Sequence, residues 1–381
     1  MALLLALPLE GTLSGCRPRE TKAVAPTPTG PSIPASQQRT EAYAIGMLVP
    51  TRGPRRSLGD EAKAAAAMAV EEANAASKGR RFVLRVRADD GPWGSQAREA
   101  AALIYDEGCC VFVAGLDGRV THVVEQVATK AQIPVVTPWA SEDTVTQAGV
   151  PWVFRCVPND RQQAAALLNV AWANGPPALL VEASFDGRGA SRALHRAAQK
   201  AGKSFALEAE VPGVAAAQQA LTRRVAQSGA GAVVMLGGSE GAAAMLPALR
   251  RQAPKLPVFA SLEACTPQLL AAAGEQAEAV RVPWPAAASS EGLADFARRY
   301  EQRNGARPTP LAAFTYDTVS LVAEALRQVG PSREQMQRFL GAADRQGVTG
   351  RIRFDRSGNR VGRLDVVSPP LMGRPLLPTK A

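Results

Sequence analysis

From Tyr43 onward the chain alternates short apolar runs with amphipathic stretches of helical periodicity, and this alternation limits the fold more than any other feature. Residues 43–49 are almost entirely apolar, as in a buried strand, whereas residues 60–76 carry acids in their first turn and one apolar face, as in a helix. Strict alternation predicts parallel sheets covered by helices on both faces, and its restart after residue 157 predicts two doubly wound α/β lobes. The remaining expected strands are 82–86 (edge-type), 110–114, 133–137, 178–181, 205–211, 232–236, 258–260 and 279–282. The final third is expected to be mainly helical and to end in two short strands.

Length and composition exclude several classes of protein. The 381 residues suit two domains of roughly 150–200 residues each. A hydrophobic fraction of 46% with 20% charged residues can build sizeable cores, which excludes wholesale disorder and a polytopic membrane protein. The net charge is +10, but aromatic residues are only 5%, so the sequence does not favour binding of nucleic acid.

The N-terminal segment has the features of an export signal. Residues 1–9 form an apolar run too short to span a bilayer, and Leu-Ser-Gly-Cys follows, ending at Cys16. This resembles the bacterial lipobox and predicts a signal peptide over 1–16 with acylation of Cys16. Residues 17–42 are rich in Pro and Thr and predict a disordered tether. The alternative is an ordinary N-terminus with a chance cysteine.

Cysteine and histidine usage does not indicate a metal site or a cofactor. The other cysteines are Cys109, Cys110, Cys156 and Cys265, and spacing alone cannot say whether two of them form a disulfide. No C-x-x-C or H-E-x-x-H motif occurs, and the only two histidines, His122 and His195, are far apart in sequence. We therefore expect no metal and no cofactor.

One motif suggests an enzyme. Gly237-Gly-Ser-Glu-Gly241 fits the G-x-S-x-G turn of serine hydrolases and lies between an expected strand and an expected helix. Both histidines precede Ser239, whereas that fold requires a histidine downstream of the serine. We interpret the motif as a small-residue turn and expect no catalytic residues, with a serine hydrolase using Ser239 as the less favoured alternative. Asp89-Asp90 is interpreted as a solvated turn.

Ligands of open α/β sheets bind beyond the carboxyl ends of the strands. A site is therefore expected in the loops that follow the strands. These loops are residues 50–59, 115–121, 138–144, 182–189, 237–241 and 261–264.

Several stretches together resemble a known family. They are Ile45-Gly-Met-Leu-Val-Pro, 59–74, Asp89-Asp90, Ile133-Pro-Val-Val-Thr-Pro, 153–160, Tyr316-Asp317 and 349–359. In this order they resemble the type 1 periplasmic binding proteins, in the branch of leucine/isoleucine/valine-binding proteins that serve ABC transporters. The resemblance implies two Rossmann-like lobes joined by a hinge of three chain crossings. Carried over, one lobe is 43–158 with 284–363, and the other is 159–283 with 364–381.

The resemblance also implies ligand-binding positions. Glu263 falls on the acid that takes a ligand ammonium, whereas Trp139, Ala140 and Ser141 fall where the ligand carboxylate is held. The other implied positions are Leu58, Gly118, Arg119, Phe185, Asp186 and Ser239. Asp186 and Ser239 stand where the family has aromatic residues, which implies a ligand other than a compact branched aliphatic one. Arg119 could pair with a second carboxylate or phosphate, or could equally point into solvent.

The leading functional hypothesis is a lipid-anchored solute-binding protein, periplasmic or on the cell surface. It would deliver a small amino acid or related anion to an ABC transporter permease, without binding nucleic acid. A ligand-sensing or regulatory receptor of the same fold is the main alternative. A scaffold that has lost its ligand also remains open, because several binding positions depart from the family.

Overall fold

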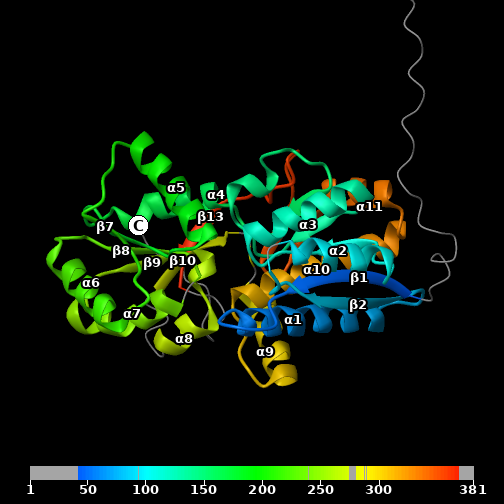
Figure 1. Cartoon of the computed structure of the whole chain (residues 1–381), viewed down its shortest axis with the longest axis horizontal. Coiled ribbons are helices and arrows are strands. Elements are labelled where there is room, and N and C mark those ends of the chain that lie inside the picture. Colours follow the sequence, from blue (N-terminus) through cyan, green and yellow to red (C-terminus); the bar gives the residue numbers. More distant parts are fainter. Residues whose placement is uncertain are drawn as a thin grey trace, which may run out of the picture. The chain divides into compact units, whose positions relative to one another are not determined.

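The structure is a computed structural model that describes residues 42–92, 94–238, 240–273, 280–286, 288 and 290–368 (Figure 1). Cys16, the predicted signal peptide, residues 17–41 of the predicted tether, and Ser239 lie outside these residues.

The first sheet has five parallel strands in the order β2-β1-β3-β4-β5. Alternate residues of β1 face opposite ways, because successive side chains of a strand point to opposite faces. Ile45 and Met47 belong to the core shared with α1, whereas Ala44 and Leu48 pack with α2 and α3. The bounds are β1 Ala42–Val49, β2 Arg81–Ala88, β3 Val111–Val113, β4 Val135–Thr137 and β5 Val153–Arg155, with α1 Arg56–Ala75, α2 Ser95–Tyr105 and α3 Gly118–Ala131. The expected parallel order and the edge position of β2 are confirmed.

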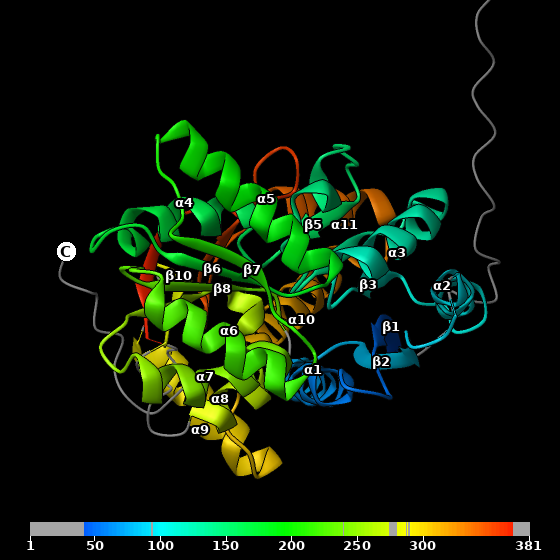
Figure 2. The same cartoon turned by 60° about the vertical axis from the view of Figure 1, so that its left-hand side comes forward.

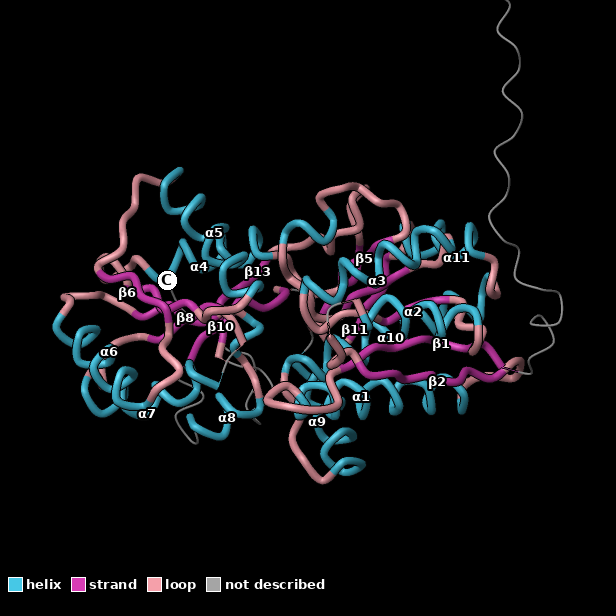
Figure 3. Tube along the Cα trace, in the orientation of Figure 1, coloured by secondary structure: helices cyan, strands magenta, loops and turns pink. Residues whose placement is uncertain are grey.

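The second sheet has six strands in the order β13-β10-β9-β8-β6-β7 (Figure 3). Figure 2 shows α4 and α5 on one side of it and α6, α7 and α8 on the other. The strands are β6 Ala178–Val181, β7 Leu207–Glu210, β8 Val233–Leu236, β9 Val258–Ala260, β10 Val280–Pro285 and β13 Leu364–Val367. The helices are α4 Asp160–Ala171, α5 Phe185–Lys200, α6 Ala215–Gln227, α7 Glu240–Gln252 and α8 Pro267–Ala273. The strands of this second sheet are parallel except for β13, which pairs antiparallel with β10.

The C-terminal third returns to the first sheet. It contains α9 Ser290–Asn304, α10 Pro310–Val329 and α11 Arg333–Gly341. Helix α10 packs along α1, and Glu61 of α1 accepts hydrogen bonds from the backbone N–H of Thr309 (2.6 Å) and from its hydroxyl (2.8 Å). The expectation of two terminal strands was wrong, because three follow α11. The hairpin of β11 (Asp344–Gly347) and β12 (Gly350–Arg353) forms a separate sheet, and β13 joins the second sheet.

The chain passes between elements of the two sheets after β5, after β10 and before β13. Arg360 ties the third passage to the first: it is 3% exposed and donates hydrogen bonds to the carbonyls of Cys156 (3.0 Å) and Thr349 (3.0 Å). Asp317 of α10 accepts hydrogen bonds from the N–H groups of Val348 and Thr349, both at 2.8 Å. A buried polar network therefore holds the segments that connect the sheets.

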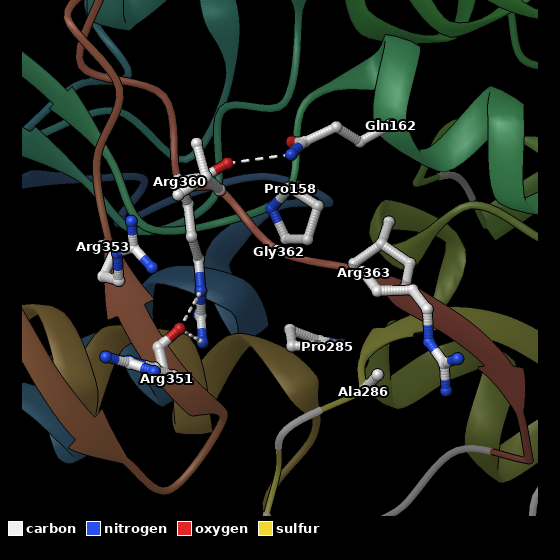
Figure 4. A pocket seen from close by; sticks show the side chains of 11 residues that line it. Pro158, Gln162, Pro285, Ala286, Arg351, Arg353, Arg360, Gly362 and Arg363 are labelled. Atoms are coloured by element: carbon white, nitrogen blue, oxygen red, sulfur yellow. Dashed lines mark hydrogen bonds between the residues drawn. The ribbon is translucent and has the colours of Figure 1, made fainter.

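A cavity of about 250 Å³ lies where the three passages meet (Figure 4). Its lining residues are Pro158, Gln162, Pro285, Ala286, Arg351, Arg353, Arg360, Val361, Gly362, Arg363 and Leu364. The arginines have partners within the chain: Arg351 is paired with Asp344 at 2.6 Å, and Arg360 donates to backbone carbonyls. The cavity is therefore a feature of the connecting segments and not a site with free cations.

Candidate functional site

Loops from both sheets surround one cavity of about 840 Å³. Each of the six loops expected at the carboxyl ends of strands contributes to its lining. Six of the residues implied by the family resemblance line it as well. They are Leu58, Arg119, Trp139, Phe185, Asp186 and Glu263.

Of the other implied residues, those that the structure describes do not line the cavity. The backbone N–H of Gly118 donates a hydrogen bond to Asp186 Oδ1 (3.0 Å), which joins the two sides of the cavity. Ala140 and Ser141 are 1% and 2% exposed and lie behind it. The Ser141 hydroxyl donates to Asp160 Oδ1 (2.7 Å), so it is engaged within the protein. Ser239 lies outside the described residues.

Glu263 reaches the cavity from the turn Leu262–Ala264, directly after β9. It is 7% exposed, and Gln163 Nε2 donates a hydrogen bond to its Oε1 (3.1 Å). Burial raises the pKa of Glu263. Hydrogen bonds from Ser141, Gln163 and Ser261 act in the opposite direction and lower this pKa. Among the described residues, no cation lies within hydrogen-bond distance of the Glu263 carboxylate to neutralise its charge.

Asp160 lies close to Glu263 and extends this acidic region. It begins α4, is 2% exposed, and its Oδ2 has no hydrogen-bond partner within the described part of the chain. Burial raises its pKa, and the negative charge of Glu263 raises it further. The pair is expensive to ionise together, so a ligand cation beside them would be stabilised.

Arg55 is a cavity residue that the sequence did not single out. It precedes α1, lines the cavity and forms an ion pair with Asp117. Asp117 also caps α3 by accepting a hydrogen bond from the N–H of Val120 (2.7 Å). Both residues lie in loops that the strand-end rule had selected, but nothing in the sequence predicted that they pair with each other.

Asp186 and Glu182 follow β6 and line the cavity. Burial raises the pKa of Asp186 to about 7, with a further contribution from the negative charge of Asp117. Burial also raises the pKa of Glu182. The side of the cavity next to Arg55 therefore carries carboxylates that are costly to ionise.

The expectation that Asp89 and Asp90 form a solvated turn was wrong for Asp89. It is 5% exposed, and burial raises its pKa to about 7, although the nearby Arg55 acts in the opposite direction. Only Asp90 fits the expectation in part, because it accepts a hydrogen bond from the Thr51 N–H (2.8 Å) at the surface.

Two arginines line the outer part of the cavity. Arg119 and Arg188 are both exposed, and neither forms an ion pair with another residue that the structure describes. Whether Arg119 meets a ligand anion or solvent stays a prediction.

Further contacts join the loops across the cavity. Arg192 of α5 lies 3.6 Å from Glu142, and Arg196 lies 3.0 Å from Asp143. His122 contacts Phe185 edge-on, with ring centroids 6.5 Å apart, and hydrogen bonds with Glu125 and Glu142 raise its pKa to about 9. Charged contacts and one aromatic contact therefore join the two sides.

The cysteines, the histidines and possible metal sites were also considered in the sequence. Cys109, Cys110, Cys156 and Cys265 are buried free thiols. Among the described residues no group of three or more potential ligands could hold a metal ion, and none of the described helices combines the length and apolar character of a membrane span. His195 hydrogen-bonds Glu208 (2.6 Å).

Known proteins are similar to this chain in sequence and in fold. The sequence model of the family described as "Periplasmic binding protein" matches residues 42–364. Over 138 residues the chain is 34% identical to "Leu/Ile/Val-binding protein homolog 3" of Brucella melitensis, which covers 35% of this chain and 37% of that protein. It is 32% identical over 122 residues to "Leu/Ile/Val-binding protein BraC3" of Rhizobium johnstonii, covering 32% and 33%. The matched stretch spans about a third of the length of these curated relatives.

Solved structures show the same fold. The branched-chain amino acid transporter substrate-binding protein LivJ of Streptococcus pneumoniae, in complex with isoleucine, superposes with a TM-score of 0.75 at 20% identity, covering 88% of this chain and 99% of that one. A solute-binding protein of an ABC transporter from Rhodopseudomonas palustris BisB5, in complex with 3,4-dihydroxybenzoic acid, gives 0.74 at 19% identity, covering 86% and 93%. Family and fold together confirm the resemblance read from the sequence: the chain has the fold of the type 1 periplasmic binding proteins, is similar in sequence to Leu/Ile/Val-binding proteins, and belongs to the family of periplasmic binding proteins.

Proposed function

We propose that this chain is an extracytoplasmic solute-binding protein that captures a small amino-acid-like ligand between two lobes and delivers it to an ABC transporter permease. Its family consists of solute-binding proteins and not of enzymes. The observation that carries the proposal is Glu263, a nearly buried carboxylate that lines the large cavity between loops of the two sheets. The proposed lobes are 43–158 with 284–363, and 159–283 with 364–381.

Glu263 is the proposed partner of the ligand ammonium. A buried carboxylate is costly unless it is paired, and a charge-assisted hydrogen bond from an ammonium would supply that pairing. The ligand carboxylate is proposed to meet the backbone of Trp139 and Ala140 and the hydroxyl of Ser141. Because that hydroxyl donates to Asp160 in this structure, it would have to exchange Asp160 for the ligand.

Replacing Glu263 tests the proposal. Glu263→Gln keeps the shape of the side chain but removes the charge, and it should weaken binding roughly ten- to a hundredfold, since charge-assisted hydrogen bonds contribute about 1.5–3 kcal/mol. The measurement is calorimetry with amino acids that raise the melting temperature in a thermal-shift panel. Glu334→Gln, on an exposed face of α11, is the matched control and should leave affinity unchanged. An unchanged Kd for Glu263→Gln, or a best ligand without an amino group, would contradict the proposal.

We also propose that Cys16 is acylated and anchors the protein to a membrane outside the cytoplasm. The support is the Leu-Ser-Gly-Cys sequence and the Pro- and Thr-rich segment behind it. In a bacterial host, Cys16→Ser should release the protein from the membrane fraction and leave the N-terminus unprocessed by mass spectrometry. Equal membrane retention of Cys16→Ser would exclude the anchor.

A further inference from the structure

We propose that the ligand carries a second cationic group, held against Asp186 and Glu182, so that the cavity selects amino acids with a basic side chain over branched aliphatic ones. This inference rests on the proposed function, because it assigns two further carboxylates of the cavity that Glu263 lines.

The two carboxylates and Glu263 line one cavity. Glu182 follows β6 directly, Asp186 lies in the first turn of α5, and Glu263 comes from the turn after β9, so all three follow strands of the second sheet. Gly237 leaves room for Glu182: it has a φ of +96°, and a Cβ there would lie 2.7 Å from Glu182 Oε2. A ligand with two cationic groups can therefore meet Glu263 with one group and Asp186 or Glu182 with the other.

The charges beside Asp186 are not balanced within the protein. Arg55 is the cation whose attraction acts on Asp89, Asp186 and Glu182, and it is already ion-paired with Asp117. Four carboxylates thus share one guanidinium. Arg119 and Arg188 line the outer part of the cavity and are exposed, so water screens their charges.

Two buried carboxylate oxygens near this lining lack a hydrogen-bond donor within the described residues. Asp89, beside Arg55, is 5% exposed, and its Oδ2 has no hydrogen-bond partner among the residues that the structure describes. The same holds for Oδ2 of Asp160, beside Glu263, which is 2% exposed. Buried polar atoms without a partner are rare in native proteins, because each loses its hydration without compensation.

The charges of Asp186 and Glu182 distinguish a basic ligand side chain from an aliphatic one. A leucine-like side chain would remove water from Asp186 and Glu182 and offer them no donor, whereas a terminal ammonium or guanidinium would donate to them directly. The same carboxylates therefore favour a basic side chain and disfavour an aliphatic one.

The test compares three probes, L-lysine, L-leucine and L-glutamate, by isothermal titration calorimetry on the full chain. The wild type should bind L-lysine at least tenfold more tightly than L-leucine. Asp186→Asn should weaken L-lysine at least tenfold, since one charge-assisted bond is lost, and it should leave L-leucine binding unchanged or tighter, since a charge that disfavours an aliphatic side chain is removed. Asp106→Asn removes an exposed carboxylate after α2 and should change neither affinity. Glu182→Gln is the second variant and should also weaken L-lysine selectively.

The outcomes separate this inference from the proposed function. Equal affinity for L-leucine and L-lysine, or L-lysine binding that neither Asp186→Asn nor Glu182→Gln alters, would overturn the inference. If L-leucine binding is then lost in Glu263→Gln, the proposed function stands without it. A preference for L-glutamate would also overturn the inference and would direct attention to Arg119. Amino-acid binding that is indifferent to Glu263 would overturn the proposed function.

Discussion

Arg155→Ala should lower the free energy of unfolding by about 3–5 kcal/mol, the usual cost of removing one partner from a buried charge network. Arg155 ends β5, is 0% exposed, and donates hydrogen bonds to the carbonyls of Ala140 (3.2 Å) and Glu142 (2.7 Å) and to the hydroxyl of Thr146 (2.7 Å). Burial lowers its pKa to about 10, while nearby acids, Asp160 first among them, act in the opposite direction. The substitution therefore leaves the carbonyls and the Thr146 hydroxyl without their donor and removes a positive charge beside Asp160.

Urea unfolding measures this effect. Arg155→Lys keeps the charge but cannot make all of these hydrogen bonds, so its loss should lie between the wild type and Arg155→Ala. Arg338→Ala removes an arginine that is 70% exposed on α11 and should change stability by less than about 0.5 kcal/mol. A loss below about 1 kcal/mol for Arg155→Ala would show that the loop around Ala140 does not depend on this side chain.

The free energy of unfolding of the ligand-free chain should fall by at least about 2 kcal/mol between pH 5 and pH 8.5. Burial raises the pKa values of Glu61, Asp89 and Asp186 to about 7, so the folded state holds protons that the unfolded chain has already released. That difference favours folding at pH 5 and is lost as the pH rises through about 7. His122 acts in the same direction: its folded pKa is about 9, so its contribution is complete below its ordinary pKa near 6.5 and is lost through about pH 9.

Urea titrations at half-unit pH steps test the sign. The double variant Asp89→Asn/Asp186→Asn should flatten the decline between pH 5 and pH 7.5, because two of the responsible groups no longer titrate. Stability that rises across this interval in the wild type would contradict the burial of these acids.

The apolar strands were the part of the fold most readily predicted from the sequence. Runs such as Val233–Leu236 cannot be exposed to water, and the helical periodicity between them leaves parallel pairing as the simplest arrangement. The antiparallel strand Leu364–Val367 could not be foreseen in the same way. Its pairing with Val280–Pro285 depends on where the last chain passage enters the second sheet, which no local pattern records.

For the candidate site, the strand-end rule selected the correct loops but not the interactions within them. Arg55 and Asp117 are 62 residues apart, and their ion pair depends on the order of strands in the sheet. The sequence also did not predict the burial of Asp89, because Gly91 and Pro92 after it are typical of an exposed turn. Sequence pattern identifies the loop that reaches a cleft, whereas the partner of each side chain follows from tertiary packing.

Ligand capture between two lobes is the central claim, and small-angle X-ray scattering of the purified chain tests it most directly. The radius of gyration is measured without ligand and at saturation with the tightest-binding of the three amino acids. Capture by closure predicts a smaller radius at saturation, and Glu263→Gln should keep the larger, ligand-free radius at a ligand concentration that saturates only the wild type. An identical radius with and without ligand, under conditions where calorimetry shows full occupancy, would contradict the claim.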